Sequence, residues 1–243
     1  MKTCLILMKT LIRKTLARSK TLKSFLIRLR ARITNQTFRY LGDVRGVIHV
    51  GANTGQEREL YAHYGLDVLW IEPIPAVFEI LRSNISAFPK QNAVQALVTD
   101  VDGYEYKFNV ASNEGASSSI YEFKDHHEIW PDITYNNTIR LTSTTLPTLL
   151  SDMNVDVDRY NCLVMDVQGA EMLVLKGALP LMDGFDYIQA EAADFEMYEG
   201  EAEISELQDF LKNIGFHEIA RHKLAEDGAS NICYELIFKR SPV

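Results

Sequence analysis

The sequence predicts an α/β fold with a mostly parallel sheet that helices cover on both faces. From residue 46 onward, strand-like and helix-like runs alternate, which is typical of a parallel sheet. A small-residue turn directly follows the first strand-like run and opens a helix-like run. The chain has 243 residues, of which 47% are hydrophobic, so it can bury one full core. The last two strand-like runs predict an antiparallel edge.

The predicted elements follow from β-branched runs and from apolar residues at helical spacing. A polar stretch over residues 111–137 has weak periodicity and is expected to be a loop. Helices are expected over residues 54–64, 76–87, 172–182 and 204–214, and Gly177 and Pro180 interrupt the third of these. Strands are expected over residues 47–50, 68–71, 93–99, 104–110, 138–145, 163–166, 187–191, 216–220 and 232–238.

Charge divides the chain into a basic extension, residues 1–40, and a main domain, residues 41–243. The extension carries eleven Lys or Arg and no acid, whereas the main domain has a net charge of −19. Residues 5–33 place apolar groups at helical spacing, which predicts a basic amphipathic helix or two in series. Peripheral contact of residues 1–35 with an anionic membrane, packing on the acidic domain, and an organellar transit peptide are the alternatives. An acidic main domain argues against nucleic acid as a partner.

The three cysteines are far apart and form no C-x-x-C pair. This pattern argues against a disulfide framework or a zinc site and fits the reducing cytoplasm. No apolar run approaches the roughly 20 residues of a membrane span. We therefore expect a cytoplasmic protein.

A nucleoside site is predicted where the first two strands end. Gly51, Ala52, Asn53 and Gly55 form a turn whose backbone can pass close to a ligand, and the following helix offers free N–H groups. Glu72 ends the second strand, 21 residues after Gly51, where a carboxylate can accept both hydroxyls of a ribose. The glycine turn and the acid together favour a nucleoside over a merely structural turn.

The residues around this turn disfavour phosphate-bearing cofactors. Gln56 and Glu57 follow Gly55, so the lysine of a P-loop is absent, and Asn53 replaces the second glycine of the NAD fingerprint. Glu57 brings negative charge to the helix start, which disfavours a pyrophosphate. S-adenosylmethionine (SAM) has no phosphate and carries a sulfonium cation, so it suits this acidic rim better.

Three segments resemble the signature blocks of FkbM-type SAM-dependent methyltransferases. They read VIHVGANTGQE, WIEP and LVMDVQGAEMLVLKGA, and the resemblance covers about residues 45–240. LTSTTLPTLL and GASSS resemble further stretches of the family. The resemblance implies a Rossmann-like class I methyltransferase fold that binds SAM and methylates hydroxyls of sugars or polyketide-type natural products.

Carried over by position, the resemblance implies that Gly51, Ala52, Asn53 and Gly55 line the SAM turn and that Glu72 holds the ribose. Asp100, near the end of the third expected strand, is expected by the adenine. Asp166 and Glu171 belong to the family's central acidic block. This sequence departs from the family pattern in two places. His49 stands where Asp is usual, and Gln168 stands where the block usually has Glu.

Methyl transfer to a hydroxyl needs a base that removes the proton during attack. Asp166 is the first candidate because it ends a central strand beside the cofactor turn. His126 and His127 are second candidates, since the 111–137 stretch can cover an acceptor. For all three, a structural role is the alternative: a loop-capping carboxylate, and exposed loop histidines.

The carboxylates of Glu191, Asp194 and Glu196 would suit Mg²⁺ together with Asp166, but a solvated acidic rim is the favoured interpretation. We expect a small-molecule or glycan acceptor. Two alternative functions remain, an NAD-dependent oxidoreductase and a non-catalytic SAM-binding protein of the same fold. The sequence indicates neither the identity of the acceptor nor the oligomeric state.

Overall fold

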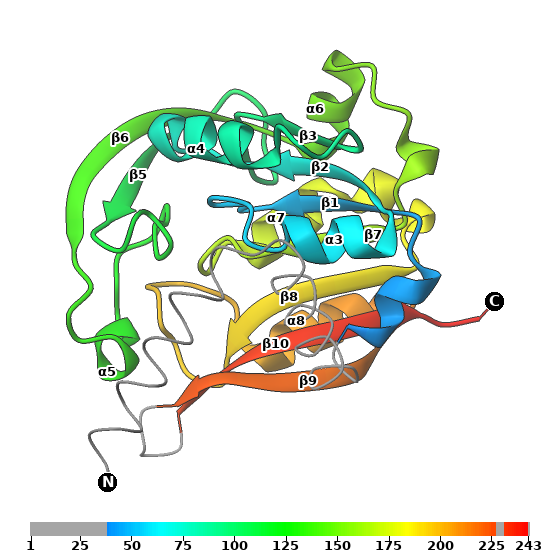
Figure 1. Ribbon diagram of the computed structural model, residues 1–243. Coiled ribbons are helices and arrows are strands. Elements are labelled where there is room, and N and C mark those ends of the chain that lie inside the picture. Colours follow the sequence, from blue (N-terminus) through cyan, green and yellow to red (C-terminus); the bar gives the residue numbers. More distant parts are fainter. Residues whose placement is uncertain (1–37, 227–230, 243) are drawn as a thin grey trace, which may run out of the picture. The chain divides into compact units, whose positions relative to one another are not determined.

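The structure is a computed structural model that describes residues 38–226 and 231–242 (Figure 1). The chain divides after Gly42, and the fold reported below is that of the unit Asp43–Val243. The predicted basic helix and the membrane contact of residues 1–35 lie outside the described residues. None of the described helices is both long and apolar enough to cross a membrane.

The described part of this unit contains a seven-stranded sheet in the order β3-β2-β1-β7-β8-β10-β9 (Figure 1). The pairs from β3 to β8 are parallel, whereas β10 pairs antiparallel with both β8 and β9. The predicted parallel sheet with an antiparallel edge is therefore confirmed. The strands are β1 Gly46–Val50, β2 Asp67–Ile71, β3 Gln91–Val94, β7 Cys162–Met165, β8 Tyr187–Ala193, β9 Phe216–Glu226 and β10 Ile232–Arg240.

Helices cover both faces of the sheet, and one face holds the main core. On that face Ile48, Leu163 and Ile188 pack with side chains of α6 (Leu146–Asp152), α7 (Glu171–Gly177) and α8 (Ile204–Asn213). All residues of β1 and β7 are buried, as expected for parallel strands covered on both sides. On the other face, Tyr61 of α3 (Arg58–Tyr64) lies against Trp70 of β2, with ring centroids 5.3 Å apart.

The 95–145 region forms a smaller sheet that sequence patterns predicted only in part. Its order is β4-β6-β5, with β4 Leu97–Val98, β5 Glu105–Ala111 and β6 Tyr135–Thr144. The single strand expected over residues 93–99 is wrong: β3 ends at Val94 in the main sheet, and β4 pairs with β6 instead. Residues 111–137 are mostly loop, as expected, but they include the short helix α5, His126–Ile129.

Two expected helices differ from the observed ones at glycines. The helix expected from residue 54 begins at Arg58, because Gly55 has a φ of +70° and the preceding residues form turns. The helix expected over residues 172–182 ends at Gly177 and continues after Ala178 as a 3-10 helix, Leu179–Gly184. The expected helix over residues 76–87 is α4, Pro75–Ile85. α6 was not predicted as a helix.

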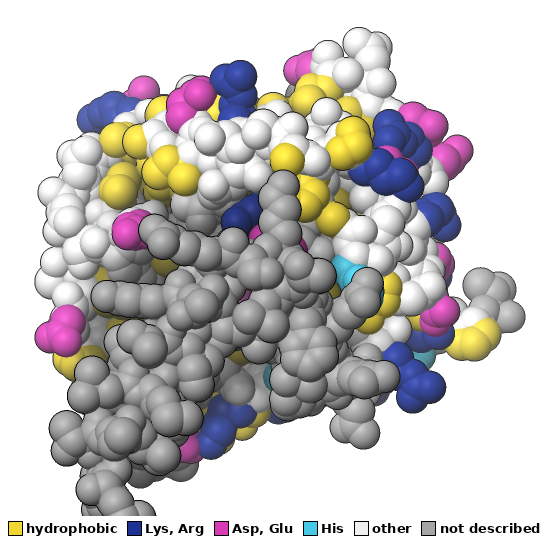
Figure 2. Space-filling model, viewed as in Figure 1, with side chains coloured by type: hydrophobic (Ala, Val, Ile, Leu, Met, Phe, Trp, Pro, Cys, Tyr) yellow, Lys and Arg dark blue, Asp and Glu magenta, His cyan; other side chains and the backbone are white. Residues whose placement is uncertain are grey.

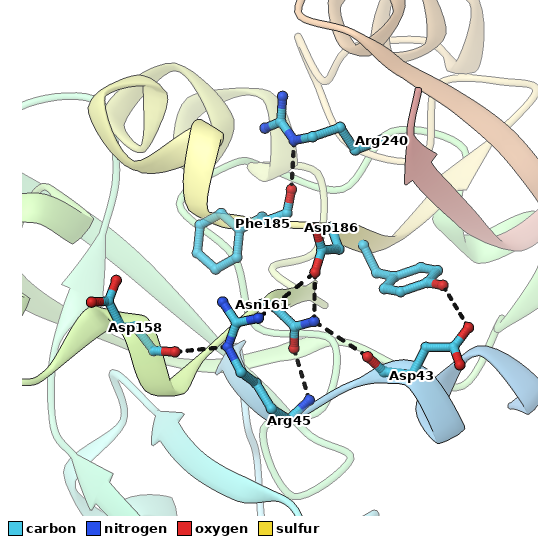
Figure 3. A network of polar contacts seen from close by, with 8 residues as sticks. Asp43, Arg45, Asp158, Asn161, Phe185, Asp186 and Arg240 are labelled. Atoms are coloured by element: carbon cyan, nitrogen blue, oxygen red, sulfur yellow. Dashed lines mark hydrogen bonds and ion pairs between the residues drawn. The ribbon is translucent and has the colours of Figure 1, made fainter. Parts of the chain in front are cut away.

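A polar network ties together the edge at which β1, β7 and β8 begin (Figure 3). Asn161 is buried there; its Oδ1 accepts from the Arg45 backbone N–H at 2.8 Å, and its Nδ2 donates to Asp186 Oδ2 at 2.7 Å. The Arg45 Nε donates to the Asp158 carbonyl oxygen at 2.7 Å. Arg240 of β10 donates to the Phe185 carbonyl oxygen at 2.8 Å. These bonds fix the strand starts, whereas the predicted site lies at the opposite, carboxyl ends.

Candidate active site

The turn after β1 is built on two glycines whose surroundings leave no room for a side chain. Gly51 has a φ of +81°, and a Cβ atom there would lie 1.8 Å from the carbonyl oxygen of Asp166. Gly55 has a φ of +70°, and its Cβ would lie 2.7 Å from Leu81 Cδ1 of α4. Glycine adopts such angles without steric cost. The ends of β1 and β7 therefore approach closely, and the backbone of the turn stays bare at Gly51 and Gly55.

Ala52 and Asn53 complete this turn and fix its shape. The Ala52 N–H donates to the Ile71 carbonyl oxygen at 3.0 Å, which extends the pairing of β1 with β2. Asn53 has a φ of +42°, an angle that asparagine tolerates because its side chain bonds locally. Its Oδ1 accepts from the Thr54 N–H at 2.8 Å, and its Nδ2 donates to the Glu114 carbonyl oxygen at 3.3 Å. The turn is thus held from β2 and from the 111–119 loop.

Glu72 lies beneath the same turn and holds it through both carboxylate oxygens. Its Oε2 accepts from the Asn53 N–H at 2.8 Å, and its Oε1 accepts from the Ile74 N–H at 2.9 Å. The side chain is buried, and burial raises the pKa of Glu72 to about 7. Each carboxylate oxygen has a second lone pair, so both can still accept from the hydroxyls of a ribose.

Asp166 follows β7 directly beside the Gly51 turn. Its N–H donates to the Val50 carbonyl oxygen at 3.0 Å, and its carboxylate accepts a hydrogen bond from the Gln168 side-chain amide. The carboxylate reaches solvent, yet protein atoms surround it closely enough that desolvation raises its pKa to about 6. An ionised, accessible acid at neutral pH is suited to accept a proton.

The loop after Asp166 is closed by Glu171, the first residue of α7. The buried Glu171 carboxylate accepts from the Val167 N–H at 2.9 Å and from the Gly169 N–H at 3.0 Å. Burial raises the pKa of Glu171 to about 8. Glu171 therefore shapes the loop from within, as Glu72 shapes the turn after β1.

Strand register places acidic residues in one row across the ends of the sheet. Val50 pairs with both Ile71 and Met165, and Met165 pairs with Ala190. The next residues along these strands therefore lie at one level, and Glu191 pairs in turn with Glu235 of β10. The row reads Glu72, Gly51, Asp166, Glu191 and Glu235.

The acids of this row raise one another's pKa values. Burial and the nearby Asp166 hold the pKa of Glu191 well above its usual range, and burial with Glu57 and Asp166 raises the pKa of Glu235 to about 7. Burial likewise raises the pKa of Glu57, which precedes α3, to about 7. At neutral pH Asp166 is ionised and Glu57 and Glu235 are partly ionised, so the field at this edge of the sheet is negative, which favours a cationic ligand and opposes a phosphate.

Comparison with known proteins identifies the family. A family model described as the methyltransferase FkbM domain matches residues 49–218, which is more than half of the chain. The chain belongs to the FkbM methyltransferase family. The match spans the Gly51 turn, Glu72 and the Asp166 loop, so the resemblance stated from the sequence motifs is confirmed.

Individual relatives of this FkbM-family chain are distant. It is 23% identical over 173 residues to the 2-O-methyltransferase NoeI of Sinorhizobium fredii (strain NBRC 101917 / NGR234), covering 68% of this chain and 70% of that protein. The METTL16 methyltransferase domain superposes with a TM-score of 0.50 at 10% identity, covering 88% of this chain and 68% of that chain. Magnesium protoporphyrin IX methyltransferase of Synechocystis PCC 6803 with bound SAH gives a TM-score of 0.49 at 9% identity, covering 92% and 88%. The family match and the likeness to the METTL16 domain show the class I methyltransferase fold.

The two departures from the FkbM pattern have structural roles here. His49 is buried against Trp70, with centroids 4.9 Å apart, and its Nδ1 lies 3.2 Å from the Tyr61 hydroxyl. Burial lowers the pKa of His49 to about 3, so the ring is neutral and joins α3 to the sheet by packing. Gln168 supplies a neutral amide donor to Asp166 where a glutamate would add a second negative charge.

The structure places the two candidate histidines on α5. His126 is buried among aromatic rings, stacked on Phe123 at 4.2 Å, and burial lowers its pKa to about 4. Its Nε2 lies 3.2 Å from the Ser117 hydroxyl. His127 is exposed and lies 3.2 Å from Glu128. Among the described residues neither histidine is hydrogen-bonded to Asp166, and their predicted role as bases stays a prediction.

Asp100 does not follow the third strand of the main sheet. It is exposed just after β4, whereas β3 ends at Val94 and is followed by Gln95 and Ala96. Gln95 continues the register of Glu72, since Val94 pairs with Ile71. The strand end that the Asp100 prediction assumed is therefore at Val94, and the role of Asp100 beside the adenine stays a prediction.

The acids considered for Mg²⁺ are engaged elsewhere. Glu196 pairs with Lys124, and Asp194 accepts from the Ile232 N–H at 2.7 Å. Within the described ranges, no three His, Cys, Asp or Glu side chains are grouped so as to hold a metal ion.

Basic side chains on the surface lie beside acidic ones. Figure 2 shows Lys and Arg interspersed with Asp and Glu among the coloured side chains of this face. Three of the exposed pairs are Arg82 with Glu79, Arg140 with Glu105 and Lys107 with Glu122. Local pairing of this kind does not produce the continuous basic surface that nucleic acid requires. The expectation of no nucleic-acid partner stays a prediction.

The sequence patterns missed several residues of the site. Ser119 is fully buried, and its hydroxyl donates to the Gln168 carbonyl oxygen at 2.7 Å, which joins the Ser-rich stretch to the Asp166 loop. The Tyr198 hydroxyl donates to the Gln168 side-chain oxygen. Glu235 enters through the antiparallel register of β10. The family motif contained Gln168, but the long-range contacts around it carry no signal in local spacing.

Proposed function

We propose that this FkbM-family protein is a SAM-dependent O-methyltransferase that methylates a hydroxyl of a sugar, a glycan or a related natural product. One observation carries the proposal: the bare Gly51 turn, Glu72 beneath it and Asp166 beside it meet at the carboxyl ends of adjacent strands. Ligands of open α/β sheets bind at this position. The similarity to a protein named as a 2-O-methyltransferase supports a hydroxyl acceptor.

The residues present fit SAM. Glu72 keeps free lone pairs for two ribose hydroxyls, and the bare glycine turn admits a ligand close to the backbone. The acidic row favours the sulfonium charge and disfavours the pyrophosphate of NAD. When bound, SAM would supply an electrophilic methyl group. Gly51, Ala52, Asn53 and Gly55 would line it, and Glu72 would hold the ribose.

Asp166 is the base in this proposal. A hydroxyl loses its proton as its oxygen attacks, so a proton acceptor must lie beside the acceptor oxygen. The Asp166 carboxylate reaches solvent, and its pKa of about 6 leaves it ionised at neutral pH. Alignment of the oxygen with the methyl group by the surrounding loops supplies the remaining acceleration.

The test is incubation of the full chain with methyl-labelled SAM and a panel of sugars, glycolipid precursors and polyketide-type alcohols. The proposal expects label in at least one hydroxyl acceptor, as an ether stable to mild base. Labelling of amines or carboxylates alone would contradict the O-methyl assignment. SAM binding without transfer to any acceptor would favour the non-catalytic alternative.

A further inference from the structure

Gln168 is a meeting point of three segments that are distant in sequence. Its backbone has a φ of +54°, and its carbonyl oxygen accepts from the Ser119 hydroxyl at 2.7 Å. On either side, the Val167 and Gly169 N–H groups donate to the buried Glu171. The backbone of this loop is therefore fixed, and the side chain of Gln168 is the part whose orientation still has to be set.

The side chain of Gln168 makes two hydrogen bonds that require opposite ends of its amide. Its nitrogen donates to Asp166, and its oxygen accepts from the Tyr198 hydroxyl. If the amide were reversed, its oxygen would face the Asp166 carboxylate, and two acceptors would oppose each other. In the observed orientation the Tyr198 hydroxyl donates to the amide oxygen, which leaves the amide nitrogen directed at Asp166.

Tyr198 is itself held rigidly. Its side chain is fully buried, and its ring lies 5.7 Å from the Phe123 ring and 5.6 Å from the His126 ring. Burial holds the pKa of Tyr198 well above its usual range, so the hydroxyl keeps its proton and remains a donor. A protonated hydroxyl on an immobile ring can fix a flexible amide with little loss of entropy.

Asp166 depends on this amide because its other charged neighbours are acidic. Burial opposes ionisation of Asp166, and the Gln168 hydrogen bond favours it. Within the described part of the chain, the hydrogen bond that the Asp166 carboxylate accepts comes from the Gln168 side-chain nitrogen. The acids that face it are Glu57 before α3, Glu72 directly after β2, Glu171 of α7, Glu191 of β8 and Glu235 of β10.

We propose that Tyr198 is a positioning residue whose hydroxyl fixes the Gln168 amide, so that this amide keeps Asp166 ionised and oriented as the base. The inference rests on the proposed function for the role of Asp166 as base. The effect of Tyr198 on Asp166 through Gln168 can be measured without a methyl acceptor, so its test does not depend on the proposed function.

The experiment follows the Asp166 carboxyl group by NMR in the full chain carrying ¹³C-labelled aspartate side chains, between pH 4 and 9. The Asp166 resonance is the one missing from Asp166→Asn. Tyr198→Phe removes the hydroxyl and keeps the ring, so the Asp166 midpoint should rise by about half a pH unit or more. Tyr135→Phe is the matched control, because Tyr135 stacks on Phe123 but its hydroxyl donates to the Tyr121 carbonyl oxygen at 2.9 Å. It should leave the midpoint unchanged.

A double-mutant cycle shows whether Tyr198 acts through Gln168. Gln168→Met removes the amide and should raise the midpoint at least as far as Tyr198→Phe does. Adding Tyr198→Phe to Gln168→Met should then change nothing further. Shifts that add, or a Tyr198→Phe midpoint equal to that of the wild type, would overturn the inference.

Two measurements cover the remaining outcomes. If Tyr198→Phe does not fold, the wild-type Gln168 side-chain N–H signal should still shift with the Asp166 titration, and a signal that ignores the titration contradicts the inference. SAM binding by calorimetry is measured on the same variants. If the wild type does not bind SAM, the proposed function alone is refuted. If SAM binding is intact and Tyr198→Phe leaves the Asp166 midpoint unchanged, the role of Tyr198 alone is refuted.

Discussion

At the scale of single residues, the site contains buried carboxylates that accept hydrogen bonds from the backbone, and one of them, Glu72, is also proposed to bind the ligand. Glu72 accepts from two backbone N–H groups, and Glu171 does the same one loop away. A buried carboxylate needs such donors, since an unpaired buried charge is costly. The same acid therefore shapes the turn and keeps lone pairs for a ribose.

Glu72→Gln should weaken SAM binding about 10- to 100-fold, because an amide nitrogen then faces a backbone N–H and one charged acceptor is lost. Isothermal titration calorimetry measures the change. The control is Glu79→Gln, since Glu79 is exposed on α4 and pairs with Arg82. Wild-type affinity in Glu72→Gln would remove Glu72 from the site.

Asp166→Asn should lower turnover about a hundredfold or more and leave SAM affinity within a fewfold, because the amide keeps the shape but accepts no proton. Steady-state kinetics with the hydroxyl acceptor found by the labelling panel gives turnover, and calorimetry gives affinity. Turnover equal to that of the wild type would show that another group is the base, and His126 and His127 would be tested next.

At the scale of elements, sequence periodicity predicted the strands and helices that are buried on regular faces. β1, β2, β7, β8, α4 and α8 begin and end within two residues of the predicted ranges. The predicted ranges were wrong where a glycine backbone angle or the choice of a strand partner sets the end of an element. Gly55 delays α3, Gly177 ends α7, and β4 leaves the main sheet to pair with β6.

In the candidate site, too, residues next to a predicted strand could be predicted, whereas residues brought in by long-range contacts could not. The Gly51 turn, Glu72 and Asp166 were predictable because each directly follows a strand-like run. Ser119, Tyr198 and Glu235 reach the site through contacts between residues 30 to 49 positions apart, which local spacing does not encode. Asp100 was placed by the adenine because two strands were predicted as one.

Gly51→Ala should unfold the turn after β1 or greatly reduce SAM binding. Its Cβ would lie 1.8 Å from the Asp166 carbonyl oxygen, so the strand ends must separate. Gly65→Ala is the control, since Gly65 has a φ of +71° but no atom within 4 Å of a Cβ. That variant isolates the strain of the angle, roughly 1–2 kcal/mol. Circular dichroism and calorimetry compare the two, and equal effects would contradict the proposed contact.

At the scale of the whole molecule, the buried acids and histidines should make stability depend on pH in two opposing ways. Burial raises the pKa of Glu72, Glu201 and Glu235 to about 7 and that of Glu171 to about 8. Between the ordinary glutamate pKa of 4.5 and these raised values, the folded state binds more protons than the unfolded state, so these acids lower stability as pH rises across that range. Burial lowers the pKa of His49 and His126, which raises stability with pH only up to about 6.5, their unfolded value.

The free energy of unfolding should therefore fall between about pH 6.5 and pH 8, where the histidines no longer contribute. Thermal unfolding followed by circular dichroism at constant ionic strength measures the slope. Glu171→Gln should be less stable than the wild type at pH 6.5 and should show a shallower decline. A melting temperature that rises over this range would show that the acids are not buried as described.

We expect the acidic site at the carboxyl ends of the strands to bind SAM and to disfavour ligands that carry a pyrophosphate. Calorimetric titration of the full chain with SAM, and separately with NAD, at pH 7.5 tests it most directly. We expect saturable binding of one SAM per chain, competed by S-adenosylhomocysteine, and no heat of binding from NAD. Binding of NAD with no detectable binding of SAM would contradict it.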